Sequence, residues 1–120
     1  MNIEEIRNYC LSKKGVEEGF PFDENTLVFK VGGKMFLLCS LDSSPVEFNV
    51  KCDPEKARRL REKYSFVFPG YNMNKRHWNT IICEQNAPKK LLFEFINDSY
   101  DLIFVSLSQK IKLEMSKMHD

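Results

Sequence analysis

The sequence lacks both a long hydrophobic run and a targeting segment. No stretch of its 120 residues approaches the ~18 consecutive apolar residues that a transmembrane helix requires. Residues 1–5 include two glutamates and no apolar segment typical of a secretion signal. Internal repeats and low-complexity tracts are also absent. We therefore expect residues 1–120 to form one domain with frayed last residues, located in the cytoplasm and without contact to a membrane.

Patterns typical of metal sites and disulfide frameworks are missing too. The chain has only two histidines, and its four cysteines form no C-x-x-C pair. Cys10, Cys39, Cys52 and Cys83 are separated by 29, 13 and 31 positions, and each lies in an apolar pattern. Zinc sites and disulfide frameworks have closer or paired cysteines. We expect free thiols in a reducing compartment, no metal site and no cofactor.

The net charge is only +1, because 18 Lys and Arg residues nearly balance 17 Asp and Glu residues. The distribution is uneven: residues 51–90 carry ten basic and four acidic side chains, whereas residues 1–50 and 91–120 carry an acidic excess. A positive region of this kind is what a surface for an anionic partner requires. Solvated helices with their own ion pairs produce the same pattern, so both interpretations stay open.

Hydrophobic periodicity predicts an α+β protein. Short connections between consecutive strands favour an antiparallel sheet. The predicted fold is a two-layer sandwich, with helices stacked on an antiparallel sheet of about five strands in the order α-β-β-β-α-β-β-α. The helices are expected over about residues 2–13, 53–64, 88–105 and 108–115, and the strands over 27–31, 35–39, 46–52, 65–68 and 78–83.

Local signals define several of these boundaries. Asn2 and Glu5 have the spacing of a capping box, which predicts a helix start. Asp53-Pro54 is a strong helix start as well. The Asp side chain accepts from the free backbone N–H groups of the first turn, and Pro has no N–H that would need a partner there. Gly32-Gly33 lies between two β-rich segments and predicts a type I′ turn.

Two segments carry apolar side chains that need a packing partner elsewhere in the fold. Residues 17–23 predict a loop, and we expect Phe20 and Phe22 to anchor it to the core. The helix over 88–105 is apolar on more than one side, which indicates the first helix as a second neighbour or a dimer contact. Its sheet-facing residues are expected to be Leu92, Phe95, Ile96, Ser99 and Ile103.

Residues 69–82 contain the only tryptophan and one of the two histidines. Lys75, Arg76, His77 and Trp78 combine two cations, a titratable ring and an aromatic plane, which suits phosphate neutralisation and base stacking. Trp78 also alternates in phase with strand residues, as a core anchor does, and His77 is equally suited to bond the loop backbone. We expect Lys75 and Arg76 to contact a ligand. Further basic residues extend this surface if the fold brings them together: Lys34, Lys51, Arg58, Arg59 and Arg61.

Residues 74–80, Asn-Lys-Arg-His-Trp-Asn-Thr, resemble the Asn-Lys-x-His-Trp-x-Thr signature of the MmcQ/YjbR family of small bacterial proteins. The resemblance implies a compact α+β fold similar to secretion chaperones and to the frataxin-like CyaY fold, and a DNA-binding role. It implies no settled catalytic activity or cofactor. One departure is Cys83-Glu84-Gln85-Asn86, where relatives often have Leu-Asp-Gly. The resemblance covers roughly residues 1–113 and includes Gly15, Phe20-Pro21-Phe22, the hairpin 29–36, Pro69-Gly70, Pro88 and Asp98-Ser99-Tyr100.

We expect a bacterial binding module that contacts the DNA backbone non-specifically through a basic surface around residues 51–76, as a monomer or weak homodimer. The alternative is a chaperone-like module that binds a protein through the helix over 88–105 and the Trp78 loop. A small-molecule-binding protein or enzyme using His77 has less support, because no nucleophile motif or phosphate-binding loop accompanies it, and we assign no catalytic residue. An exposed Trp78 favours the first interpretation, a buried Trp78 with an apolar patch the second, and a pocket lined by His77 the third.

Overall fold

The computed structural model describes residues 1–70 and 73–118. No helix in this described part of the chain is long and apolar enough to cross a bilayer. The elements follow one another in the order α1 (Ile3–Leu11), β1 (Val16–Gly19), β2 (Thr26–Val31), β3 (Lys34–Ser40), β4 (Glu47–Lys51), α2 (Pro54–Lys63), β5 (Val67–Pro69), β6 (Trp78–Ile82), α3 (Lys89–Ser106) and α4 (Gln109–Met118).

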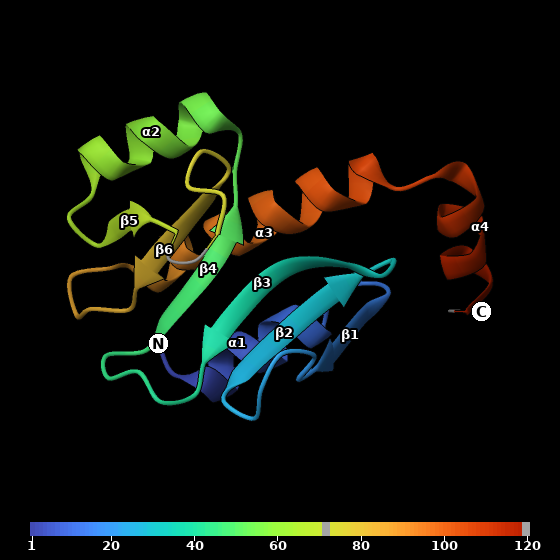
Figure 1. Cartoon of the computed structure of the whole chain (residues 1–120), viewed down its shortest axis with the longest axis horizontal. Coiled ribbons are helices and arrows are strands. Elements are labelled where there is room, and N and C mark those ends of the chain that lie inside the picture. Colours follow the sequence, from blue (N-terminus) through green and yellow to red (C-terminus); the bar gives the residue numbers. More distant parts are fainter. Residues whose placement is uncertain (71–72, 119–120) are drawn as a thin grey trace.

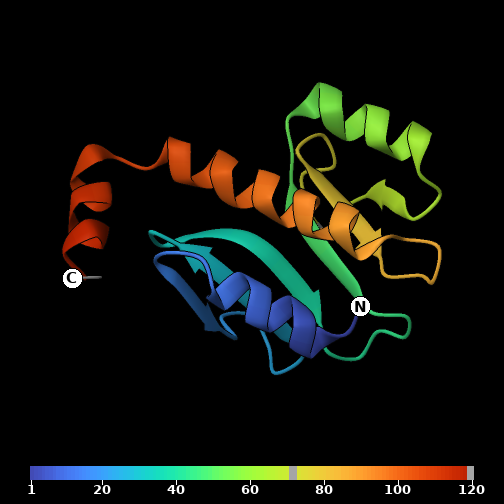
Figure 2. The same ribbon diagram turned by 180° about the vertical axis from the view of Figure 1, so that it is seen from behind.

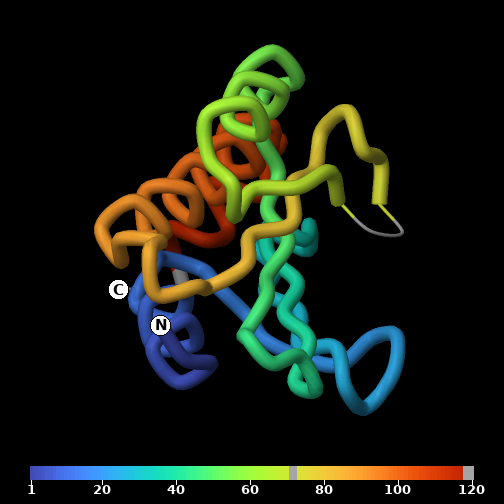
Figure 3. Tube along the Cα trace, turned by 90° about the vertical axis from the view of Figure 1, so that its left-hand side faces the viewer, coloured from blue at the N-terminus to red at the C-terminus, as the bar shows by residue number. Residues whose placement is uncertain are grey.

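The strands form one antiparallel sheet with two unequal faces. The strand order is β1-β2-β3-β4-β6-β5, and every neighbouring pair is antiparallel. Helices α1 and α3 cover one face, α2 lies at the β5–β6 end, and α4 lies beyond the far end of α3 (Figures 1 and 2). In the edge-on view, the β1–β2 and β5–β6 connections project on the side away from these helices (Figure 3). The predicted two-layer α+β fold is thereby confirmed.

The predicted helix starts and the predicted tight turn are present. The Asn2 side chain accepts from the Glu5 N–H at 2.8 Å, and the Glu5 carboxylate accepts from the Asn2 N–H at 3.3 Å. Asp53 accepts from a backbone N–H of α2, whose first residue is a proline. Gly32 and Gly33 have φ values of 58° and 82°, so both occupy the left-handed region that a type I′ turn requires.

The core fills the space between the sheet and the helices. Phe29 and Leu37 on β2 and β3, and Phe48 and Ile81 on β4 and β6, are fully buried on this face. Because side chains alternate along a strand, one face of every central strand contributes to this core. All α3 residues predicted to face the sheet are buried: Leu92, Phe95, Ile96, Ser99 and Ile103.

The first helix is the second neighbour of α3, as one of the two interpretations proposed. The rings of Tyr9 and Phe93 stack with their centroids 4.1 Å apart. The Tyr9 hydroxyl also donates to Asn97 Oδ1 at 2.7 Å. Aromatic pairs of this geometry add to the burial of apolar area, so α1 and α3 form a continuous helical layer.

The sheet has six strands, so the prediction of about five missed one. Residues 17–23 were expected to form a loop, but residues 16–19 form the edge strand β1, which pairs with β2 from Val16↔Val31 to Gly19↔Val28. An edge strand is held by backbone hydrogen bonds on one side only, and two of the four residues of β1 are exposed glutamates. Its side chains therefore carry no apolar alternation that a sequence pattern could detect.

The prediction that Phe20 and Phe22 anchor their loop to the core is wrong. Phe20 is 51% exposed and Phe22 is 63% exposed. Both follow β1 in the connection that projects on the helix-free side of the sheet (Figure 3). Exposed aromatic rings beside a sheet face indicate an interaction surface more than a packing role.

The last helix also forms as predicted. The Ser108 hydroxyl accepts from the Ile111 N–H at 3.2 Å, which caps α4. The segment packs against the β2–β3 turn so closely that a Cβ atom at Gly32 would lie 2.6 Å from Leu107 Cδ1. Gly32 therefore serves both the turn and the contact with this segment.

Ser99 joins α3 to an irregularity in the sheet. The register of β2 and β3 shifts beside Phe36, so the consecutive residues Phe36 and Leu37 are both fully buried. The fully buried Ser99 hydroxyl donates to the Phe36 carbonyl at 2.6 Å and accepts from the Lys51 N–H at 2.8 Å. One side chain thus satisfies backbone groups of β3 and β4 beside the residue at which the β2–β3 register shifts.

Replacing Ser99 with alanine should lower the free energy of unfolding by about 2–4 kcal/mol, because the buried Phe36 carbonyl and the partly buried Lys51 N–H lose this partner. Urea unfolding followed by circular dichroism measures this loss. The matched control is Ser106→Ala on the same helix, because the Ser106 hydroxyl bonds only the Ile103 carbonyl of its own turn. The control should stay within about 0.5 kcal/mol of the parent protein, and equal effects of the two variants would refute the assigned role.

Candidate functional site

The helix-free face of the sheet carries a second apolar cluster, which we call the outer cluster. Trp78, Val28 and Leu38 are its buried members, and Met35 and Met73 pack against them. Trp78 is only 8% exposed. Of the two predicted roles, this burial favours Trp78 as an anchor, here of the outer face, over its ring as a stacking surface for bases.

A groove of about 480 Å³ lies beside the outer cluster. The β1–β2 connection contributes Phe22 to its wall and the β5–β6 connection contributes Met73. These two connections project from the same side of the sheet (Figure 3). The groove is also lined by the apolar Met35, Leu38 and Cys39 and by the polar Thr26, Ser40, Ser43, Glu47 and Asn49.

The turn that precedes β6 holds its backbone firmly and leaves two cationic side chains exposed. The Asn74 carbonyl accepts from the His77 N–H at 3.1 Å and from the Trp78 N–H at 2.9 Å. The Asn74 side chain accepts from the Arg76 N–H at 3.0 Å. Lys75 and Arg76 are exposed at the tip of this turn. Their positions are therefore defined by backbone hydrogen bonds that do not depend on their side chains.

His77 is part of the same support. Its carbonyl accepts from the Cys52 N–H at 2.7 Å, which ties the turn to the end of β4. The residue is half-buried, and it lines none of the larger grooves among the described residues. This contact uses only the backbone of His77, so it assigns no role to the imidazole, and the enzymatic interpretation finds no pocket among these grooves.

Arg61 connects α2 to this turn. Its Nε donates to Asn79 Oδ1 at 2.6 Å, and its Nη2 donates to the Lys75 carbonyl. Asn79 is 1% exposed and also donates to the Ala57 carbonyl at 3.3 Å. Because its guanidinium is engaged inside the protein, Arg61 is a positioning residue for the turn. Its inclusion among the ligand-contacting residues stays a prediction, which these internal hydrogen bonds disfavour.

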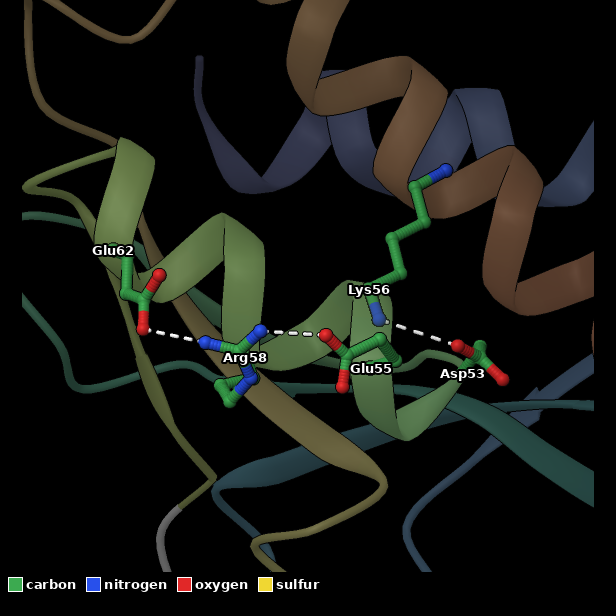
Figure 4. Close-up of polar contacts among 5 residues, drawn as sticks. All are labelled: Asp53, Glu55, Lys56, Arg58 and Glu62. Carbon is green, nitrogen blue, oxygen red and sulfur yellow. Dashed lines mark hydrogen bonds and ion pairs between the residues drawn. The ribbon is translucent and has the colours of Figure 1, made fainter.

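Arg58 is neutralised by its own helix. Its guanidinium lies between Glu55 at 2.5 Å and Glu62 at 2.6 Å (Figure 4). Hydrogen bonding to Glu55 raises the pKa of Arg58, and the same bond lowers the pKa of Glu55. Lys56 is paired as well, because its ammonium lies 2.6 Å from Asp98 on α3. Much of the positive charge of α2 is thus compensated locally.

Three of the predicted cations meet near the turn. Lys51 pairs in register with Trp78 and therefore lies on the outer face. Lys75 and Arg76 lie on the adjoining turn, and no ion pair within residues 1–70 and 73–118 engages any of the three. Arg59 is exposed on α2 and is likewise without an ion pair in this part of the chain.

Lys34 does not join this group. It pairs in register with the buried Val31, so it lies on the helix face of the sheet, beside the β2–β3 turn. Lys30 takes a comparable place on the outer face, since it pairs with Met35 of the outer cluster. The sequence contains this signal, because Lys30 alternates in phase with Val28, but the faces can be assigned only when the pairing partners are known.

The described residues offer no evident metal centre. No group of three or more His, Cys, Asp or Glu side chains within residues 1–70 and 73–118 is arranged to hold a metal ion. All four cysteines are free, as predicted, and three are buried, with Cys83 half-buried. The arrangement offers hydrogen bonds, apolar contacts and positive charge to a ligand.

These features define a class of protein: a small α+β protein with helices on one face of an antiparallel sheet and a groove between two loops on the other. The chain belongs to the YjbR family, whose model matches residues 11–102. The family resemblance inferred from the signature at residues 74–80 is therefore confirmed.

Relatives and solved structures agree with this assignment. The chain is 35% identical to Escherichia coli O157:H7 protein YbdF over 107 residues, which cover 89% of this chain and 88% of that protein. It is 29% identical to Escherichia coli K12 protein YjbR over 100 residues, covering 83% and 85%. Both relatives are described as uncharacterized, so they bring no activity with them.

The crystal structure of Deinococcus radiodurans protein DR2400, with a DUF419 domain, matches with a TM-score of 0.89 and 32% identity, covering 96% of this chain and 88% of that chain. A Pseudomonas syringae protein matches with a TM-score of 0.73 and 24% identity, covering 85% and 98%. The first match supports the family and the second supports the fold.

Replacing Arg61 with alanine should lower the free energy of unfolding by about 1.5–3 kcal/mol, because the charge-assisted hydrogen bonds to Asn79 and to the Lys75 carbonyl are lost. Thermal and urea unfolding measure the loss. Arg59→Ala is the matched control and should change stability by no more than about 0.5 kcal/mol. An Arg61→Ala protein as stable as this control would contradict the positioning role.

The cysteines should be unreactive in the folded protein. Burial raises the pKa of Cys10 and of Cys39 to about 12 and that of Cys83 to about 11. At pH 8 a thiol with a pKa near 12 has a thiolate fraction on the order of a thousand-fold lower than a free thiol. We expect slow reaction with a colorimetric disulfide reagent in buffer and fast reaction of all four thiols in guanidinium chloride. One thiol reacting at the free rate in the native protein would contradict this expectation.

Proposed function

We propose that this chain is a small binding module that contacts the phosphate backbone of nucleic acid without strong sequence preference. The observation that carries the proposal is the pair Lys75 and Arg76, exposed on a turn whose backbone is held by Asn74. A turn whose backbone is already held by hydrogen bonds loses little backbone freedom when its cations meet a phosphate. Neutralising phosphates and releasing their counterions is the main source of non-specific affinity for nucleic acid.

The contact surface is smaller than the full set of basic residues in residues 51–76. It includes Lys51 on the outer face, with Lys75 and Arg76 on the turn. Arg59 extends it along the exposed side of α2. Arg58 contributes little, because two glutamates compensate its charge. The proposal therefore rests on unpaired cations and not on the sum of positive charge.

A second candidate is a chaperone-like module that binds a protein partner. It is favoured by the burial of Trp78 and by two exposed apolar residues on α3, Leu102 at 39% and Val105 at 74%. These residues line a groove of about 330 Å³ together with Cys52 and Asp101. The rest of the apolar surface of α3 is used by the sheet and by α1, so the remaining patch is small.

The proposal predicts a steep and local salt dependence. The protein should bind a fluorescein-labelled duplex, measured by anisotropy, with an affinity that falls as salt rises. The double variant Lys75→Gln/Arg76→Gln should bind more weakly, and the slope of log K against log salt should decrease by about 2 units, because about one unit is lost per phosphate contact.

The matched control is Lys110→Gln/Lys117→Gln, which removes the same charge from α4 at the opposite end of the molecule from α2 (Figure 1). The control should retain the slope of the parent protein. Equal losses in both double variants would indicate only a net-charge effect. No binding at tens of micromolar protein and low salt would refute the proposed function and leave the protein-binding module as the candidate to test.

A further inference from the structure

The cations of the proposed phosphate contact do not line the groove on the outer face, but they lie next to residues that do. Met73 lines the groove, and Lys75 follows it by two residues on the same connection. Asn49 lines the groove, and Lys51 follows it by two residues on the same face of β4. A ligand that spans this distance can therefore contact the cations and the groove together.

The chemistry of the groove suits a flat heterocycle. Phe22 offers an exposed ring, and Met35, Leu38 and Met73 offer apolar and sulfur surfaces. Ser40, Thr26 and Asn49 place hydroxyl and amide groups along the same surface. An apolar slot with a few polar groups at its edges is what recognition of an unpaired base requires.

The two ends of the groove differ in charge, so a bound ligand has a preferred orientation. Lys51 and the turn carrying Lys75 and Arg76 lie toward one end, at the β4 C-terminus. Glu47, at the opposite end of β4, is the one acidic residue among those lining the groove. A phosphate is attracted to the first end and repelled from the second, whereas a carboxylate is a suitable acceptor for the amino group of a base. The charge pattern therefore fits a ligand with an anionic backbone and a neutral, polar base.

We propose that the groove binds unpaired bases of single-stranded nucleic acid whose backbone follows Lys51, Lys75 and Arg76. This inference rests on the proposed function and specifies its substrate class. In a duplex the bases are stacked and paired, so their faces cannot enter a groove between two loops; in a single strand they can turn toward the protein. Stacking on Phe22 then adds a contribution that does not depend on sequence, because every base has an aromatic face.

The test compares single-stranded and duplex oligonucleotides of equal length at one low salt concentration, by anisotropy. The parent protein should prefer the single strand. Phe22→Ala should weaken single-strand binding about fivefold or more and leave duplex binding unchanged. The matched control is Phe20→Ala, because Phe20 is 51% exposed on the same connection but does not line this groove. Both side chains are exposed, and circular dichroism verifies that the variants are folded.

A second readout reports stacking directly. A single strand that contains 2-aminopurine should lose fluorescence on binding to the parent protein and to Phe20→Ala, and less so on binding to Phe22→Ala. Loss of quenching together with retained phosphate-dependent binding identifies the aromatic contact itself.

The outcomes separate the inference from the proposed function. Equal affinity for single strand and duplex, sensitive to Lys75→Gln/Arg76→Gln but not to Phe22→Ala, would overturn the inference and leave the proposed function standing. No binding to either form would overturn both. Competition by free nucleotides at the same concentration of nucleotide units would also overturn the inference, since it would assign the groove to a mononucleotide.

Discussion

The division of the sheet into a packed face and an outer face depends on how α3 is joined to it. Ser99 bonds the Phe36 carbonyl and the Lys51 amide beside the residue at which the β2–β3 register shifts, so it satisfies a buried acceptor and a partly buried donor. This junction holds α3 over the central strands, while α1 lies against β1 and stacks on α3. Because the apolar sides of α1 and α3 both pack on one face of the sheet, the other face is available for loops and a groove.

Electrostatic compensation decides which cations remain for a ligand. The basic residues of the stretch 51–90 differ in their partners. Arg58 forms ion pairs within α2, and Arg61 is hydrogen-bonded to the turn before β6. Lys75, at the tip of that turn, has no ion pair among the described residues. The position of Lys75 depends on Arg61, because Arg61 donates to the Lys75 carbonyl and so supports the turn. The proposed phosphate-contacting surface is thus supported by Arg61, a cation that the proposal does not place against phosphate.

Short-range signals made much of the fold predictable. Asn2 with Glu5, Asp53 with Pro54 and Gly32 with Gly33 act within a few residues, and each has its predicted conformation. The buried face of α3 followed from helical spacing alone. The edge strand β1 could not be found in this way, because backbone pairing on one side imposes no side-chain pattern. The exposure of Phe20 and Phe22 could not be predicted either, because no periodic pattern in a loop indicates what an apolar side chain contacts.

For the site, the sequence alone determined the family, the signature at residues 74–80 and the presence of two neighbouring cations in it. The tertiary structure decided which side chains share a surface. Trp78 is in phase with the outer face and is covered there, Lys34 lies on the helix face, and Lys51 lies beside the turn. Local conformation follows from interactions between residues close in the chain, whereas the faces and neighbours of a strand follow from its register with strands far away in the sequence.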